Sequence, residues 1–257
     1  MERLSDNKPT GMNGNALRTW GLLFLTAGVI GRGLLQTHIL GIGQLSAQEL
    51  LAAMGASQMT MILVTFSLVL QALETCAAPI FGLMLVTGAE KTGNFNAYIL
   101  RVTGLAVLAE LPYNLAMKGS LLDMTSRNPV FAMVLCLILL YFYRRYAEKT
   151  VQHILIRVVV TVAAVLWGQM LRIDSGSCMV ILVTVLWAFR KKPLYRNFAG
   201  AAAAVVCTMI TPFYLAAPMG FLAVHFYNGE QSTNSRLVNY LAYPAILLVT
   251  ALVGILL

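Results

Sequence analysis

The chain has 257 residues, of which 59% are apolar and only 11% charged, and its net charge is +8. Soluble domains carry roughly 25% charged residues, so this composition excludes an ordinary water-soluble fold and indicates that most side chains face lipid or one another. The basic residues lie in short runs between apolar stretches and form no continuous basic face. We therefore expect the lipid bilayer as a partner and no nucleic acid.

The amino-terminal segment and the cysteines predict little chemistry of their own. Residues 1–15 are polar and rich in Gly and Asn, which is typical of a disordered cytoplasmic tail, and we expect 16–257 to form a single transmembrane domain. The four cysteines lie in or beside apolar segments without a CxxC or CxxH spacing. This pattern predicts neither a disulfide framework nor a metal site.

Nine apolar runs follow in chain order, most of them near the roughly 20 residues that a helix needs to cross a bilayer. They fall at about 17–41, 58–88, 97–117, 129–146, 154–172, 177–190, 198–215, 216–227 and 237–257. The segment 46–55 is predicted to be a helix that lies at the membrane interface. The second run is too long for one straight crossing, and we expect Pro79 to break it. The predicted fold is an all-α, polytopic membrane helix bundle of about nine transmembrane helices.

The distribution of basic residues predicts the orientation of this bundle. With the amino terminus in the cytoplasm, 14 of the 18 Lys and Arg residues fall in cytoplasmic segments. The opposite orientation would place the two densest basic clusters outside, against the positive-inside rule.

Ionisable residues at membrane depth are costly and are therefore candidate site residues. Glu74, Glu110 and His225 are the candidate catalytic groups, and Arg32 lies in the second half of the first helix. Three of them also have a structural explanation: Arg32 could extend to the interface, His225 could be interfacial, and Glu110 could bond a neighbouring helix. Because Leu-Pro112 follows Glu110, we expect the helix to be broken there.

The pair Arg172 and Asp174 closes the fifth run and fits the outer headgroup region. The chain has no phosphate-binding Gly loop, no HExxH and no GxSxG motif. Residue chemistry alone therefore predicts a membrane protein with a polar interior.

Short stretches with Gly, Pro, Asn and aromatic residues punctuate the apolar runs. They are Ala78–Gly88, Lys91–Asn94, Tyr98–Arg101, Leu108–Asn114, Asn128–Phe131, Ile173–Gly176, Tyr227–Gly229 and Asn239–Pro244. In this order and spacing, over nearly the whole chain, they resemble the TraX family, which is named for the conjugation protein needed to acetylate F pilin.

The resemblance implies an acyltransferase-like protein of the bacterial cytoplasmic (inner) membrane. It implies transfer of an acyl group, typically acetyl from acetyl-CoA as a co-substrate that is not covalently bound, onto an amine or hydroxyl of a protein or small-molecule acceptor. Candidate coenzyme-binding residues are Arg144, Arg145, Arg32 and Asn128, with the 190–196 basic cluster as another option.

The expected acid–base residues of the family are replaced in this chain. Where active members are expected to carry an Asp-His pair in the first helix, this sequence has Gly28 and Val29. An expected Gly-Arg pair appears as Glu74-Thr75, and an expected His in the last helix is Ile246. Neither Val nor Ile can take the role of an imidazole.

Three functions therefore remain open. The first is acyl transfer, retained or lost, with the chemistry moved onto Glu74, Glu110 or His225. The second is a non-catalytic membrane subunit that holds a partner in a secretion, conjugation or transport assembly. The third is a solute or proton-coupled transporter, which the lack of an inverted repeat disfavours.

Overall fold

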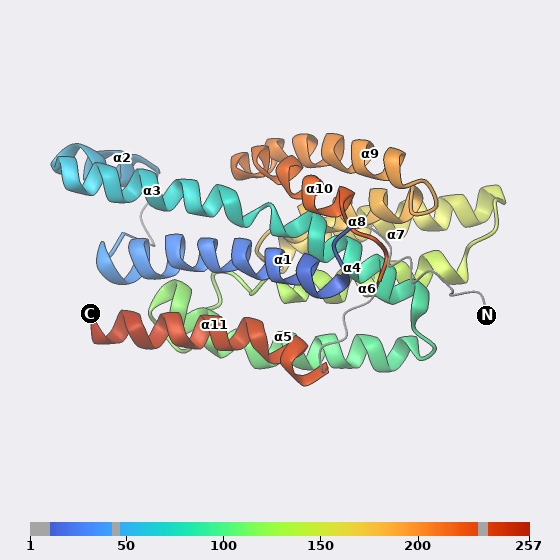
Figure 1. The fold of residues 1–257 in the computed structure, drawn as a ribbon, viewed down its shortest axis with the longest axis horizontal. Helices are drawn as coiled ribbons and strands as arrows, with labels where there is room; N and C mark the ends of the chain where they lie inside the picture. The colour runs from blue at the N-terminus through green and yellow to red at the C-terminus, as the bar shows by residue number, and fades with distance from the viewer. Residues whose placement is uncertain (1–10, 43–46, 231–235) are drawn as a thin grey trace, which may run out of the picture.

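The computed structural model describes residues 11–42, 47–230 and 236–257. Within these ranges the chain is all-α, as the sequence predicts, and most helices run along the long axis of an elongated bundle (Figure 1). The two isolated β-bridges among the described residues join loops, Met12 to Tyr227 and Arg127 to Ile173. Each bridge ties together one end of the bundle.

The first span is α1 (Gly14–Gly28), which continues without interruption into the π-helix η1 (Val29–Ile39). Asn13 caps its start, because its side chain accepts a hydrogen bond from the Ala16 amide at 2.9 Å. The backbone amide of Met12 donates to the Phe226 carbonyl at 2.8 Å. The expected tail of residues 1–15 is thus ordered from Gly11 onward, and residues 1–10 lie outside the described part of the chain.

The interfacial helix expected at 46–55 corresponds to α2 (Ala47–Ala56), and residue 46 lies outside the described ranges. The long second run forms α3 (Gln58–Glu74) and α4 (Ala77–Lys91). The break predicted at Pro79 lies at Thr75 and Cys76, three to four residues before the proline. A proline ring clashes with the carbonyl four residues earlier but fits in the first turn of a helix. Pro79 therefore lies inside α4 and the irregular turn precedes it.

The second predicted break does not occur. α5 (Phe95–Lys118) is one continuous helix of 24 residues with Pro112 inside it. Proline removes one backbone hydrogen bond, and packing against neighbouring helices can compensate for this loss in a membrane protein. α5 packs along α11 and also contacts α6, which holds it in place.

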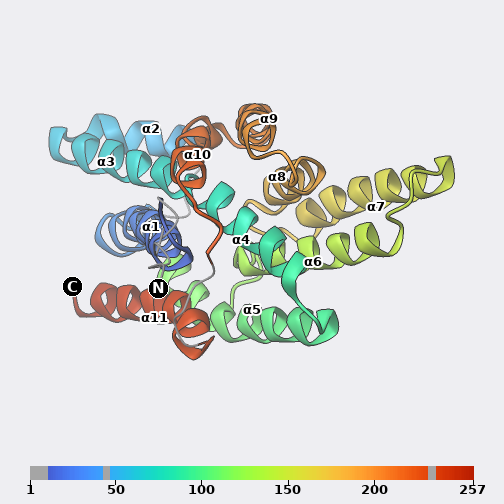
Figure 2. The same ribbon diagram turned by 45° about the vertical axis from the view of Figure 1, so that its right-hand side comes forward.

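The remaining helices complete the bundle around α4. They are α6 (Val130–Arg145), α7 (Val151–Met170), α8 (Gly176–Ala188), α9 (Pro193–Val206), the 3-10 turns η2 (Cys207–Met209) and η3 (Pro212–Leu215), α10 (Ala217–His225) and α11 (Arg236–Leu256). α4 contacts α1, α6, α8 and α10, and it lies in the middle of the bundle in Figure 2.

The bundle has the character of a membrane protein. Four helical segments of the described residues are long and apolar enough to cross a bilayer: Gly14–Ile39, Gln58–Lys91, Phe95–Lys118 and Val151–Met170. Gly176–Ala188 and Tyr240–Leu256 are shorter apolar helices. Large apolar side chains such as Leu155, Val158 and Val162 are exposed, as lipid contact requires. The number of nine crossings stays a prediction.

Contacts between loops define two ends of the bundle. At the first end, Met12 contacts Phe226, the Lys91 ammonium reaches the Gly229 carbonyl, and Arg190 pairs with Glu90. At the second end, the loop before α6 is bridged to the loop between α7 and α8. The first end carries the basic loops that the positive-inside rule predicts to be cytoplasmic.

Candidate functional site

A cavity of about 500 Å³ runs inside the bundle beside α1 and α4. Its lining combines apolar side chains of α1, α4, α5 and α6 with a smaller set of polar groups. The polar lining residues are Arg18, Arg32, Gln71, Glu74, Thr75, Thr87, Thr92, Tyr98, Arg101, Asp174, Ser175, Thr211, Tyr214, Tyr227, Tyr240 and Tyr243. An apolar pocket with a few convergent polar groups is the usual form of a small-molecule site.

The polar groups at one part of this cavity form an ion cluster of Arg32, Asp174 and Glu74. The Arg32 guanidinium makes a hydrogen-bonded ion pair with Asp174, and its other Nη lies 3.7 Å from a Glu74 oxygen. The Tyr113 hydroxyl donates to the same Asp174 oxygen at 3.1 Å. Two carboxylates thus share one cation, so the cluster carries an excess negative charge when both are ionised.

Burial of Asp174 would raise its pKa, but the Arg32 guanidinium and the Tyr113 hydroxyl outweigh this effect and hold the pKa below its ordinary value. Asp174 is therefore a fixed anion. Glu74 has the longer contact with Arg32, and its side chain keeps 16% exposure. Of the two carboxylates, Glu74 is less tightly engaged and is the better candidate to accept a proton.

Two backbone features of the first span bring these groups together. Arg32 lies in the π-helical segment, and π-helical turns occur often at functional sites. Gly28 faces Glu74 so closely that a Cβ at Gly28 would overlap the carboxylate and lie 2.5 Å from the Glu74 Cβ. A residue with any side chain at position 28 would displace Glu74. The glycine is therefore what allows a carboxylate of α3 to reach this place.

The other part of the cavity lies at the first end of the bundle. It is lined by Arg18 of α1, Tyr98 and Arg101 of α5, and Tyr240 of α11. Arg18 and Arg32 are separated by 14 residues, so the two arginines are about 21 Å apart along the helix axis. The cavity thus connects a cationic mouth, with Arg18 and Arg101, to the partly buried ion cluster.

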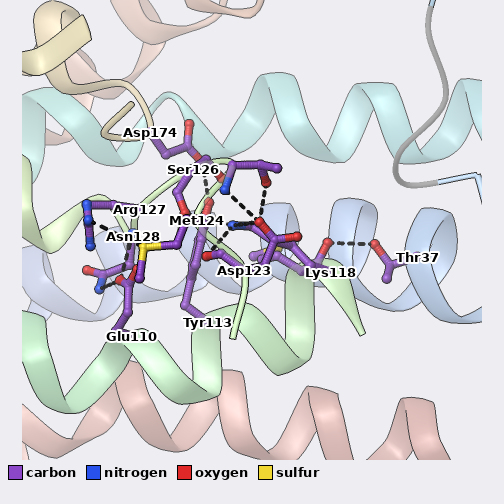
Figure 3. Close-up of polar contacts among 12 residues, drawn as sticks. Thr37, Glu110, Tyr113, Lys118, Asp123, Met124, Ser126, Arg127, Asn128 and Asp174 are labelled. Atoms are coloured by element: carbon purple, nitrogen blue, oxygen red, sulfur yellow. Dashed lines mark hydrogen bonds and ion pairs between the residues drawn. The ribbon is translucent and has the colours of Figure 1, made fainter. Parts of the chain in front are cut away.

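Glu110 and Asn128 meet each other outside the cavity (Figure 3). A Glu110 carboxylate oxygen accepts from the Asn128 backbone amide at 3.2 Å and from its side-chain amide, which also donates to the Ala106 carbonyl at 2.8 Å. The Asn128 side-chain oxygen, Oδ1, accepts from the Val130 backbone amide at 3.0 Å and so supports the start of α6. Glu110 thus makes a structural hydrogen bond to a neighbouring segment, one of the two predicted alternatives for this residue.

The loop between α5 and α6 holds Asp174 in place through its backbone. Arg127 donates its amide to the Arg172 carbonyl at 2.8 Å, and the Asp174 amide donates to the Arg127 carbonyl at 3.0 Å. The loop itself is fixed by the Lys118 ammonium, which bonds the Asp123 carboxylate at 3.1 Å. Hydrogen bonds from Thr125 lower the pKa of Asp123 to about 2, so this carboxylate is ionised at neutral pH.

The remaining candidates lie apart from the ion cluster. His225 is exposed at the end of α10, at the first end of the bundle, where its ring contacts Phe226 edge-on. Arg144 donates to the Ala89 carbonyl at 2.8 Å and stacks over the Phe95 ring, and Arg145 is exposed beside it. Of the predicted site residues, the structure places Arg32 and Glu74 together in the cavity, and it does not bring Glu110, Asn128, Arg144, Arg145 or His225 to them.

Sequence reasoning missed Asp174 as a partner of Arg32, since both residues are near run ends where headgroup contacts are expected. A usable signal was present: Asp174 stands in Ile173–Gly176, one of the stretches that carry the family resemblance. The cavity residues Arg18 and Arg101 are among the 14 basic residues of the predicted cytoplasmic segments, and the sequence indicates no binding role for them. A basic residue reaches the cavity only if its helix is rotated so that the side chain faces inward. The positions of the loops in the sequence do not determine this rotation.

Comparison with known proteins identifies the family. The model of the TraX family, described as TraX protein, matches residues 51–254, which excludes α1 but includes most of the cavity-lining helices. Neither a curated protein nor a solved structure matches the chain. Because the match covers most of the 257 residues and agrees with the stretches found in the sequence, the chain belongs to the TraX family.

Proposed function

We propose that this TraX-family membrane protein transfers an acyl group, typically acetyl, from acyl-CoA to an amine or hydroxyl acceptor in a conjugation-related process. The observation that carries the proposal is the cavity that joins the cationic mouth to the ion cluster. The mouth offers Arg18 and Arg101 to the coenzyme phosphates, because guanidinium groups bind phosphates through charge-assisted hydrogen bonds. The apolar walls accommodate the pantetheine arm.

Glu74 is the candidate general base of this reaction. It lines the cavity and its contact with Arg32 is longer than that of Asp174, which Arg32 and Tyr113 engage directly. A carboxylate of this kind can take the proton of the attacking group when it lies within hydrogen-bond reach. Arg32 positions both carboxylates, and its positive charge opposes the accumulation of negative charge next to the thioester.

The reaction balances without a further reagent. The acceptor nitrogen or oxygen attacks the thioester carbonyl while Glu74 takes its proton. The carbon–sulfur bond then breaks, and the coenzyme leaves as a thiol after it receives that proton. An amide or ester of the acceptor and free coenzyme A are the products.

Purified protein in detergent tests the proposal. We expect acetyl-CoA to raise the melting temperature in a concentration-dependent manner, and an acceptor amine to cause release of coenzyme A, detected by chromatography. Glu74→Gln should abolish release while it leaves the thermal stabilisation in place. Glu110→Gln is the matched control and should retain release, since Glu110 bonds Asn128 outside the cavity.

Gly28 and Val29 stand where an Asp-His pair is expected, and this favours a second candidate function. In that case the protein is a TraX-family scaffold that binds a partner and has lost acyl transfer. That function predicts stabilisation by a stoichiometric membrane partner, with no acetyl-CoA effect. Absence of any melting shift at millimolar acetyl-CoA would therefore refute acyl transfer and favour the scaffold.

A further inference from the structure

A second hollow lies next to the cavity, at the first end of the bundle. This groove, of about 520 Å³, is bounded by the last residues of α4, the first turns of α9, and the segment that follows α10. Its lining residues are Thr87, Lys91, Pro193, Leu194, Arg196, Asn197, His225, Tyr227, Asn228 and Gly229. We refer to it below as the α4–α9 groove.

The α4–α9 groove is cationic. Two cations, Lys91 and Arg196, line it beside the His225 imidazole, and none of its lining residues, all within the described part of the chain, is acidic. The nearby acid Glu90 is engaged elsewhere, because its carboxylate pairs with the Arg190 Nε at 2.8 Å. The Asn228 side-chain amide donates to the carboxylate of Glu230, just outside the groove, at 3.1 Å, and the Asn197 side-chain oxygen accepts from the Arg196 guanidinium at 3.2 Å. A concave site with this composition favours an anion that presents several oxygen acceptors.

The groove adjoins the cavity through shared residues. Thr87 of α4 and Tyr227 line both hollows. Along α4, Thr87 stands 12 residues after Thr75, which gives about 18 Å between the shared boundary and the level of the ion cluster. A ligand could therefore keep an anionic head in the groove and extend a narrow tail past Thr87 and Tyr227 to Glu74.

We propose that the α4–α9 groove binds the 3′-phosphoadenosine end of the acyl-CoA donor, with Lys91 and Arg196 on the 3′-phosphate. The inference rests on the proposed function and specifies where the donor's nucleotide lies. It divides the donor's anionic groups between two sites: Arg18 and Arg101 at the cavity mouth contact the pyrophosphate, and the groove contacts the ribose phosphate. His225, a catalytic candidate from the sequence, becomes a residue of the nucleotide site.

Donors that differ in a single phosphate test this division. Affinities of acetyl-CoA and of acetyl-dephospho-CoA, which lacks only the 3′-phosphate, are measured by thermal shift for the wild-type chain, Lys91→Ala, Arg196→Ala and Arg18→Ala. We expect the wild type to prefer acetyl-CoA, and the two groove variants to lose roughly 10–100-fold in acetyl-CoA affinity while binding of the dephospho donor hardly changes. Lys149→Ala, an exposed cation of the loop between α6 and α7, is the matched control and should bind both donors as the wild type does.

The two proposals fail in different ways. If the wild-type chain binds acetyl-CoA but the groove variants weaken both donors equally, or neither, the groove is not the phosphate site while the proposed function stands. If the groove variants instead lose only binding to vesicles rich in anionic lipid, the groove serves lipid headgroups and the inference is overturned. If the wild type binds neither donor, the proposed function fails and this inference with it.

Discussion

The close approach of Gly28 and Glu74 allows a sharp mutational test of how the ion cluster is built. We expect Gly28→Ala to destabilise the protein, although alanine is the better helix former by about 1 kcal/mol. The added Cβ would overlap the Glu74 carboxylate and lie 2.5 Å from the Glu74 Cβ. Because that second atom is fixed to the backbone of α3, side-chain rotation alone cannot relieve the overlap.

The size of the effect follows from overpacking. Inserting a methyl group into a well-packed interior costs about 1–3 kcal/mol, and for a chain of this length 1 kcal/mol corresponds to roughly 2–4 °C in melting temperature. In a Glu74→Gly background all three overlapping atoms are absent. The same Gly28→Ala change should then be neutral or stabilising, by up to about 1 kcal/mol from helix propensity. The sign of the effect should therefore reverse between the two backgrounds.

Thermal unfolding in detergent, followed for the four proteins of this double-mutant cycle, measures the coupling. Gly104→Ala on α5 is the matched control, because a Cβ at Gly104 would meet nothing within 4 Å. It should raise the melting temperature regardless of residue 74. If Gly28→Ala raised the melting temperature of the otherwise wild-type chain as Gly104→Ala does, the packing of α1 on α3 described above would be wrong.

Three further changes test other parts of the site, each by thermal unfolding. Removing one partner of a fully buried ion pair costs about 3–5 kcal/mol of stability. Because the side chains of Arg32 and Asp174 keep 28% and 20% exposure, Arg32→Ala should cost less, about 2 kcal/mol. Arg32→Lys should recover part of this loss. Glu110→Ala leaves the Asn128 donors without their acceptor and should cost about 1–3 kcal/mol; an unchanged melting temperature would argue against that bond. Asp123 has its pKa lowered to about 2, so it stabilises the fold above its unfolded pKa of about 3.9, and this contribution is lost as the pH falls toward 2. The melting-temperature difference between wild type and Asp123→Asn should accordingly shrink between pH 5 and pH 2, and a constant difference would contradict the assigned hydrogen bonds.

Much of the fold was predictable because apolar length is a strong signal. Each of the nine apolar runs corresponds to one or more helices, and the start of α2 agrees with the expectation to within a residue or two. Of the two proline-based predictions, the break in the second run is confirmed to within four residues of Pro79, and the break at Pro112 is wrong. Proline determines only which backbone bond is lost; neighbouring helices decide whether the helix then breaks, as before Pro79, or continues, as at Pro112.

The candidate site was predictable only in part. Arg32 and Glu74 stand out in sequence as charges within apolar runs, and the structure brings them together. Their third member, Asp174, comes from a loop 100 residues after Glu74, and its position depends on a backbone bridge between Arg127 and Ile173 that no local pattern reveals. The wide π-helical turn at Arg32 likewise depends on packing against α3 and α11, so helical periodicity would misplace this side chain.

The position of α7 has a consequence for how sequences of this kind can change. This helix contacts α6 and α8 at the edge of the bundle, and only 11% of its most apolar window is buried. Substitutions among Val, Ile and Leu on its outer surface should be nearly neutral, and variation between close relatives should accumulate there. Gly168 is the exception, because a Cβ on it would lie 2.9 Å from the Ser177 amide nitrogen. One glycine thus preserves the attachment of a helix that is otherwise free to diverge.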